Sequence, residues 1–177
     1  VTMSEAVYNT NGGSGALEAA DFALSISGGV ATMSSATPTS ISSSGNIYTL
    51  GIGLSGTPNG SETLTVAPVD NGIYDYSGNE ASTSQSNNTA SLNDQLPATI
   101  SSVALAADNS TIAVTMSEAI YSTNGGSGAM AVSDFVLSVS GGTAAITNSG
   151  APTSISASGN VYTLGVGLST LADGSET

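Results

Sequence analysis

The sequence contains no Lys, Arg, His, Cys or Trp, and each absence excludes a class of function. Without Lys or Arg the chain cannot neutralise phosphates, which argues against binding to nucleic acid or to an anionic membrane surface. Without His, Cys or Lys it has no side chain that could activate a serine nucleophile. Paired carboxylates remain as a catalytic device, but neither "SEA" nor "GSET" resembles a glycosidase motif. We therefore predict that the protein is not an enzyme.

Long apolar runs are also absent, so we expect no segment to insert into a membrane. The chain carries 13 acidic side chains and a net charge of −13, yet only 7% of its residues are charged. Its surface must therefore consist mostly of Ser, Thr, Asn and Gly. The apolar fraction of 39% is enough for a core. A buried or clustered carboxylate can be neutralised here only by backbone N–H groups, by protonation or by a bound metal ion.

The chain repeats itself. The opening "VTMSEAVYNTNGGSG" returns as "VTMSEAIYSTNGGSG" from residue 114. Residues 1–36 align with 114–149, and 37–63 align with 151–177 after one inserted residue, Gly150. The period of about 113 residues is too long for a solenoid and suits a complete β-sandwich domain.

The repeat boundary is expected near Pro97, where the turn-forming "NDQLP" precedes a new strand, "ATISSVALA". This gives two repeats: residues 1–96, expected to lack the first strand, and residues 97–177, expected to lack the last strands. We interpret the chain as an excerpt of a longer tandem array. The alternative is a short natural protein of one and a half repeats.

Short alternating runs indicate that the secondary structure is almost entirely β. Turn formers separate these runs, and only "SGALEAADF" is expected to form a helical turn. The alternation places Tyr48 and Tyr162 in the core. The predicted fold class is all-β, with tandem antiparallel sandwiches joined by Greek-key connections. The alternating runs are "FALSI", "NIYTLGIGL", "LTV", "STIAVTMSE" and "FVLSV".

Several motifs resemble the immunoglobulin-like repeats of giant bacterial surface proteins, including those of the cyanobacterial swimming-motility surface protein and S-layer-type modules. Ser4-Glu5 and Ser117-Glu118 match a V-T-aromatic-S-E motif, although Met3 and Met116 replace the aromatic residue. Asp75, Gly78 and Asn79 match a D-x-x-G-N motif. The resemblance implies an Ig-like sandwich, secreted or on a bacterial cell surface, that serves as a stalk, filament or adhesin shaft. Its partners would be neighbouring repeats or identical chains.

Oxygen-bearing side chains gather in "VDNGIYDYSGNEAS", residues 69–82, and oxygen is the ligand that Ca²⁺ prefers. If calcium is bound, we expect EDTA to lower the melting temperature of one complete unit by several degrees. The alternative is that Asp75 and Asn79 only cap a tight turn. Glu5 joins this group if the first and last strands are neighbours. The candidate calcium ligands here are Glu5, Asp70, Asp75, Asn79 and Glu80.

A second candidate calcium site lies at the junction of the repeats, formed by Asp94, Asp108 and Glu118. The alternative is that these are solvated surface carboxylates. Asp21 and Asp134 precede the repeated Phe and are interpreted as caps of a short helix or strand entry.

Tyr74 and Tyr76 bracket Asp75 and are candidates for stacking on a sugar. They support a second hypothesis for function, a ligand-binding adhesin module whose target is a carbohydrate or another cell-surface molecule. The alternative is that both rings are buried with hydrogen-bonded hydroxyls. A shaft predicts no pocket, whereas a binding module predicts a cleft lined by these tyrosines.

Overall fold

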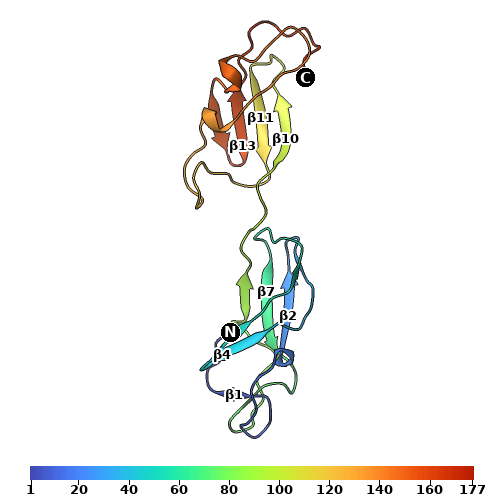
Figure 1. The fold of residues 1–177 in the computed structure, drawn as a ribbon, viewed down its shortest axis with the longest axis vertical. Coiled ribbons are helices and arrows are strands. Elements are labelled where there is room, and N and C mark those ends of the chain that lie inside the picture. The colour runs from blue at the N-terminus through green and yellow to red at the C-terminus, as the bar shows by residue number, and fades with distance from the viewer. The chain divides into compact units, whose positions relative to one another are not determined.

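A computed structural model covers residues 1–177 and shows an all-β chain whose strands pair antiparallel (Figure 1). The chain divides into two compact units, Val1–Leu96 (unit 1) and Pro97–Thr177 (unit 2). The division falls at the residue where the sequence places the repeat boundary. Each unit contains its own hydrophobic cluster.

Unit 1 is built from four small antiparallel sheets, with strand orders β2-β7-β9, β4-β5, β1-β8 and β3-β6. The longest pairing joins β2 to β7 along six residues of each strand. The strands are β1 (Val7–Tyr8), β2 (Phe22–Ser27), β3 (Thr32–Met33), β4 (Ile41–Ser44), β5 (Ile47–Leu50), β6 (Leu54–Ser55), β7 (Thr63–Pro68), β8 (Tyr74–Asp75) and β9 (Thr89–Ser91).

The core of unit 1 forms around Phe22 and Tyr48, whose ring centroids lie 6.0 Å apart. Leu17 and Ile73 complete the buried cluster. Phe22 begins β2, and alternation along that strand also buries Leu24. The pattern in "FALSI" is therefore the one that the sequence predicts.

Unit 2 contains one four-stranded sheet with the order β10-β11-β13-β12. Its core holds Val114, Tyr162 and Leu164, with Phe135 and Ile112 packed against them. The predicted burial of Tyr48 and Tyr162 is thus confirmed in both units. The strands are β10 (Ile100–Leu105), β11 (Thr111–Met116), β12 (Ile155–Ser158) and β13 (Val161–Gly165).

Helical structure is limited to three short 3₁₀ turns, η1 (Ala19–Asp21), η2 (Val132–Asp134) and η3 (Asn148–Gly150). The first of these confirms the helical turn predicted in "SGALEAADF", and η2 is its counterpart in the second repeat. The "NGGSG" loops close as tight hairpins in both repeats, each with one isolated bridge: Thr10 to Ser14 and Thr123 to Ser127.

Two predictions about strands are wrong. Residues 135–139, "FVLSV", form no strand, although the equivalent "FALSI" forms β2 in unit 1. The reason is that β2 pairs with β7, whereas the counterpart of β7 in unit 2 amounts to Thr177, which pairs with Ser140. The run "NIYTLGIGL" does not continue as one strand either: β5 ends at Leu50, and Gly51 turns its N–H to the Ser40 carbonyl.

Candidate functional site

The most strongly built polar feature of the chain is the carboxylate of Glu62, which is fully buried. Its Oε1 accepts hydrogen bonds from the backbone N–H of Val30 at 2.8 Å and of Ala31 at 3.0 Å. Its Oε2 accepts a third from the Asn59 N–H at 3.1 Å. Glu62 directly precedes β7, and its side chain reaches the turn that follows β2. One carboxylate therefore holds together the loop after β2 and the loop before β7. We call Glu62 and its backbone donors the carboxylate lock of unit 1.

The turn that receives this carboxylate depends on glycine. Gly29 has φ +59°, a conformation that L side chains rarely adopt. A Cβ at Gly29 would also lie 2.1 Å from Glu62 Cδ. The "SGG" turn is therefore shaped to leave room for the carboxylate.

The pKa of Glu62 shows how the missing cations are replaced. Burial by itself raises the pKa of this carboxyl, but the hydrogen bonds from Ala31, Val30 and Asn59 outweigh it and lower the pKa to about 2. The charge is therefore kept and is neutralised by backbone N–H groups, one of the three routes that the composition leaves open. No buried side-chain nitrogen or oxygen in the chain is without a hydrogen-bond partner.

Unit 2 repeats this lock at the matching positions. Glu176 Oε1 accepts from Thr143 N–H at 3.0 Å and from Ala144 N–H at 3.1 Å, and its Oε2 accepts from Asp173 N–H at 3.0 Å. The Ala144 hydrogen bond is the largest influence on the Glu176 pKa, and together with the other backbone donors it lowers that pKa to about 2. A Cβ at Gly142 would lie 2.2 Å from Glu176 Cδ. Both repeats thus conserve the carboxylate, the donors and the glycine that makes room.

Sequence reasoning did not single out either glutamate. The motif "GSET" carries no sign of which distant amides will surround its carboxylate. A signal was nevertheless present, because "SGG" and "GSET" recur together at nearly the same spacing in a chain without cations.

In the predicted calcium segment the Asp75 carboxylate is already engaged by its own turn. Asp75 Oδ1 accepts from the Asn79 N–H at 2.8 Å, and Oδ2 accepts from Asn79 Nδ2 at 2.7 Å. The side-chain bond from Asn79 is the main cause of a lowered Asp75 pKa, and the backbone bond adds to it. This is the geometry of the turn-capping alternative.

The remaining candidates in this segment lie on exposed positions. Asp70 accepts a hydrogen bond from Asn71 Nδ2 at 3.0 Å, and Glu80 accepts from the Asn71 N–H. Glu5, Asp75, Asn79 and Glu80 are among the residues that line one groove of unit 1. No three acidic side chains converge on a point that could hold an ion. Calcium binding here stays a prediction.

The three junction carboxylates belong to two units, Asp94 to unit 1 and the others to unit 2. Asp94 accepts from the Leu96 N–H at 2.9 Å. Asp108 accepts from the N–H and hydroxyl of Ser110 at 3.0 and 2.6 Å, and the hydroxyl bond is the main cause of its lowered pKa. Asp94 and Asp108 each cap a turn of their own unit, and a junction ion that includes Glu118 also stays a prediction.

Asp21 and Asp134 cap the short helices as predicted. Asp21 Oδ2 accepts from the Glu18 N–H at 2.7 Å at the start of η1. Asp134 does the same for the Ala131 N–H at 2.8 Å at the start of η2.

The two candidate sugar-stacking tyrosines have different surroundings. Tyr76 is 73% exposed and meets Tyr8 edge-on, with ring centroids 6.2 Å apart. Tyr74 is half-buried in β8, and its hydroxyl donates to Asn71 Oδ1 at 3.4 Å. Burial is therefore the wrong prediction for Tyr76, whose ring is held on the surface by Tyr8. Neither tyrosine lines the groove.

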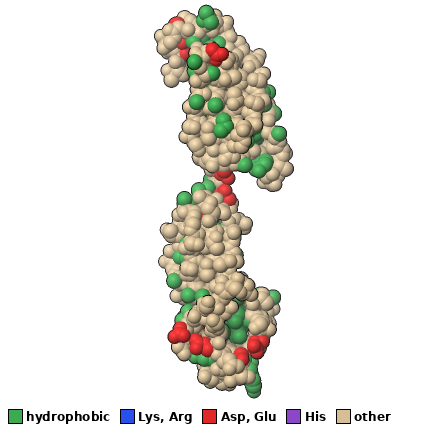
Figure 2. Space-filling model, turned by 180° about the vertical axis from the view of Figure 1, so that it is seen from behind, with side chains coloured by type: hydrophobic (Ala, Val, Ile, Leu, Met, Phe, Trp, Pro, Cys, Tyr) green, Lys and Arg blue, Asp and Glu red, His purple; other side chains and the backbone are tan.

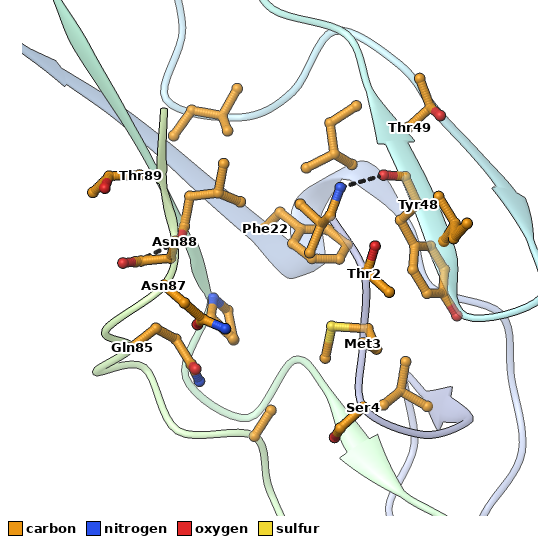
Figure 3. Close-up of a pocket in the computed structure, with 18 of the residues that line it drawn as sticks. Thr2, Met3, Ser4, Phe22, Tyr48, Thr49, Gln85, Asn87, Asn88 and Thr89 are labelled. Carbon is orange, nitrogen blue, oxygen red and sulfur yellow. Dashed lines mark hydrogen bonds between the residues drawn. The ribbon is translucent and has the colours of Figure 1, made fainter. Parts of the chain in front are cut away.

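The groove itself has a volume of about 810 Å³ and runs beside the core of unit 1. Figure 3 shows Phe22 at its centre, with Met3 and Tyr48 on one side and the amides Gln85, Asn87 and Asn88 on the other. Its walls combine apolar side chains of β2, β5 and β7 with the polar segment 85–90. The titratable side chains that line it are those of Glu5, Asp75, Glu80 and Tyr48.

Acidic side chains form small separate groups on a surface that carries no basic group, as Figure 2 shows. The chain has no helix with the length and apolar character needed to cross a membrane. No family model, curated protein or solved structure matches this chain. The function must therefore be argued from the repeats, the locks and the groove.

Proposed function

We propose that the chain is a structural repeat module of an extracellular bacterial surface protein, where it serves as part of a stalk or filament shaft. The observation that carries this proposal is the recurrence of the carboxylate lock. Glu62 in unit 1 and Glu176 in unit 2 hold equivalent loops through equivalent backbone donors. What the two repeats share is thus a device that holds each unit together, which is what serial mechanical units require.

Composition supports the same proposal. A chain without Lys or Arg offers trypsin-like proteases no cleavage site, which suits a segment exposed outside the cell. Its surface of Ser, Thr, Asn and Gly keeps it hydrated with few charges. Neighbouring repeats, or identical chains in a filament, are the partners we propose.

We further propose that a full repeat is an Ig-like sandwich with Greek-key connections. Unit 2 contains a sheet of order β10-β11-β13-β12, and unit 1 contains a sheet of order β2-β7-β9. In a full repeat we expect one sheet of each kind, packed face to face. Together these sheets have about the seven strands of an Ig-type domain. The resemblance of the sequence motifs to bacterial Ig-like repeats agrees with this arrangement.

Force spectroscopy on the full chain, held between two well-characterised handle domains, tests the shaft proposal. We expect two separate unfolding events, one for each unit, with full recovery when the force is released. Glu62→Gln should lower the unfolding force of one event, and Glu176→Gln that of the other. A single cooperative event, or unfolding forces unchanged by both substitutions, contradicts independent load-bearing units.

A ligand-binding adhesin module is the second candidate, favoured by the groove and by the exposed ring of Tyr76. Screening the full chain against immobilised glycans tests it, with Tyr76→Ala as the variant and Tyr121→Ala as the matched control. Tyr121 is also exposed, at 51%, and lies in the other unit. Binding that is lost with Tyr76→Ala and kept with Tyr121→Ala supports the adhesin; no binding to any glycan supports the shaft.

A further inference from the structure

Four Asn-Gly pairs occur in the chain, and each has the groups for one self-modification. The backbone nitrogen of the glycine attacks the carbonyl carbon of the Asn side chain, forms a C–N bond and expels ammonia, which takes the proton of the glycine N–H. Water then opens the resulting succinimide ring, adding OH to one carbonyl carbon and hydrogen to the ring nitrogen, and yields Asp or isoaspartate. Glycine favours the attack because it has no Cβ to hinder it. The pairs are Asn11-Gly12, Asn59-Gly60, Asn71-Gly72 and Asn124-Gly125.

Two of these pairs lie at the tips of the repeated "NGGSG" hairpins. Asn11 and Gly12 are exposed, and so are Asn124 and Gly125. No hydrogen bond holds the side chain of either asparagine or the N–H of either glycine; Asn11 Oδ1 only rests against Gly78. A Cβ at Gly12 or Gly125 would meet nothing within 4 Å, so the backbone at both tips has room to turn toward the Asn side chain.

The pair Asn71-Gly72 is held in place by its surroundings. Gly72 is buried, and its N–H, which must be free to react, donates to Val69 O at 3.0 Å. Asn71 Nδ2 donates to Asp70 Oδ2 at 3.0 Å, and Asn71 Oδ1 accepts from the Tyr74 hydroxyl at 3.4 Å. The attack would have to break these bonds and turn a buried peptide group, so the fold opposes the reaction here.

The pair Asn59-Gly60 is held by the carboxylate lock of unit 1. The Asn59 N–H donates to the two oxygens of Glu62 at 3.2 and 3.1 Å, and Asn59 Oδ1 accepts from the Ser61 N–H at 3.1 Å. The asparagine is therefore fixed through both its backbone and its side chain. The negative charge of Glu62 also disfavours the charge that the Gly60 nitrogen develops as it loses its proton.

Unit 2 shows which product the lock can accept at this position. Asp173 stands where unit 1 has Asn59, and its N–H donates to Glu176 Oε2 at 3.0 Å while its Oδ1 accepts from the Ser175 N–H at 2.9 Å. An ordinary Asp thus fits the lock. Isoaspartate would instead lengthen the backbone between the N–H of residue 59 and Glu62 by one carbon, which would displace a donor of the lock.

We propose that the two hairpin tips, at Asn11 and Asn124, are sites of spontaneous deamidation in the folded chain, and that the fold protects Asn59 and Asn71 from the same reaction. The only co-reactant is water. Each event adds one negative charge to a unit, in a loop outside the named strands. The repeats thus gain charge with time at their hairpins while the locks keep their donors. The inference goes beyond the shaft function, because it holds whatever the chain does.

The test is to incubate the full chain at mildly alkaline pH and to map its fragments by mass spectrometry. A protease that cleaves after Glu separates the four pairs into fragments 6–18, 19–62, 63–80 and 119–176. The chain denatured in urea is the reference, because local sequence alone sets the rates there. We expect folding to slow the reaction at Asn59 and Asn71 at least about tenfold, and at Asn11 and Asn124 by less than about threefold.

Two variants of the full chain separate the structural causes. The chain with both Asn11→Gln and Asn124→Gln should stay a single species on anion exchange while the native chain splits into more acidic forms. Glu62→Gln should speed the reaction at Asn59 several-fold and leave Asn71 slow, which shows that unit 1 is still folded.

Three results would overturn the proposal. The first is that folding slows all four pairs equally, or none of them. The second is that the doubly substituted chain becomes acidic as fast as the native chain. The third is that Glu62→Gln speeds Asn71 as much as Asn59, since general unfolding of unit 1 would then control both sites and the lock would protect neither.

Discussion

The two repeats carry nearly the same sequence and yet form different strands. "FALSI" is paired and buried as β2 in unit 1, whereas "FVLSV" in unit 2 forms no strand, and Val136 there is 81% exposed. The reverse holds at the other sheet, where β13 is longer and better covered than β5. The difference teaches that strand formation in this chain depends on the presence of a partner strand more than on local sequence.

The largest expected effect comes from the repeated phenylalanine. Phe22 is 2% exposed, whereas Phe135 is half-buried beside Tyr162. We expect Phe22→Ala to destabilise unit 1 by about 3–5 kcal/mol, because it removes a large side chain that is almost fully buried. Phe135→Ala should destabilise unit 2 by less than half as much. Chemical denaturation of the full chain, followed through NMR signals of each unit, measures both; equal losses would contradict the comparison.

The next effect separates two glycines of unit 1 that share a backbone conformation. Gly29 and Gly45 have φ +59° and +58°, so an added Cβ strains both by roughly 1–2 kcal/mol. A Cβ at Gly45 would meet nothing within 4 Å, whereas at Gly29 it would collide with Glu62. We therefore expect Gly29→Ala to lower the free energy of unfolding at least about twice as much as Gly45→Ala. If a denaturation experiment shows that the two substitutions lower the free energy of unfolding equally, the Glu62 side chain can move to accommodate the added Cβ.

These comparisons also explain how much the sequence could predict. Alternation located β2, β7 and β11, and the "NDQLP" break located the boundary of the units and the strand β10 that follows it, because both are local signals. The missing strand at 135–139 could not be foreseen from that pattern, since it depends on whether a β7 partner is present. The two carboxylate locks could not be predicted for a related reason: the Glu62 carboxylate meets the N–H groups of Val30 and Ala31 only after two loops have folded together.

The candidate calcium ligands were chosen by residue type, and four of them are among the residues that line the groove of unit 1. Their pairing could not be predicted in the same way. Whether Asp75 binds an ion or its own turn depends on a backbone geometry that "DYSGNE" allows but does not require. The exposed ring of Tyr76 depends likewise on Tyr8, which lies in a strand far away in sequence.

A smaller effect concerns acid. A carboxylate with a lower pKa in the folded state stabilises fully above its unfolded pKa of 4.5, and this stability is lost as the pH falls toward about 2. We expect both units to lose stability in that window, since the pKa values of Glu62 and Glu176 are both about 2. Glu62→Gln should reduce the acid dependence of unit 1 alone, and Glu176→Gln that of unit 2 alone. Thermal unfolding at pH 7, 4 and 2.5 measures this. If the melting temperature of either variant falls with pH as steeply as that of the native chain, other carboxylates cause the acid sensitivity.

The smallest effect distinguishes the turn from the ion in residues 69–82. Asp75→Asn replaces one of the two carboxylate oxygens that accept from Asn79 with an NH₂ donor, so it breaks one of these two hydrogen bonds and should lower the melting temperature of unit 1 by about 1–3 °C. Asp70→Asn is the matched control, because Asp70 is exposed and bonds only to the neighbouring Asn71 side chain; its effect should stay within about 1 °C.

The same three proteins, measured with EDTA and with millimolar Ca²⁺, then test the ion. A rise of several degrees that Ca²⁺ causes in the native chain and that both substitutions remove establishes a structural ion. Identical melting with Ca²⁺ and with EDTA leaves Asp75 as a turn-forming residue, whose carboxylate is bonded by the backbone and side-chain amides of Asn79 and by no ion.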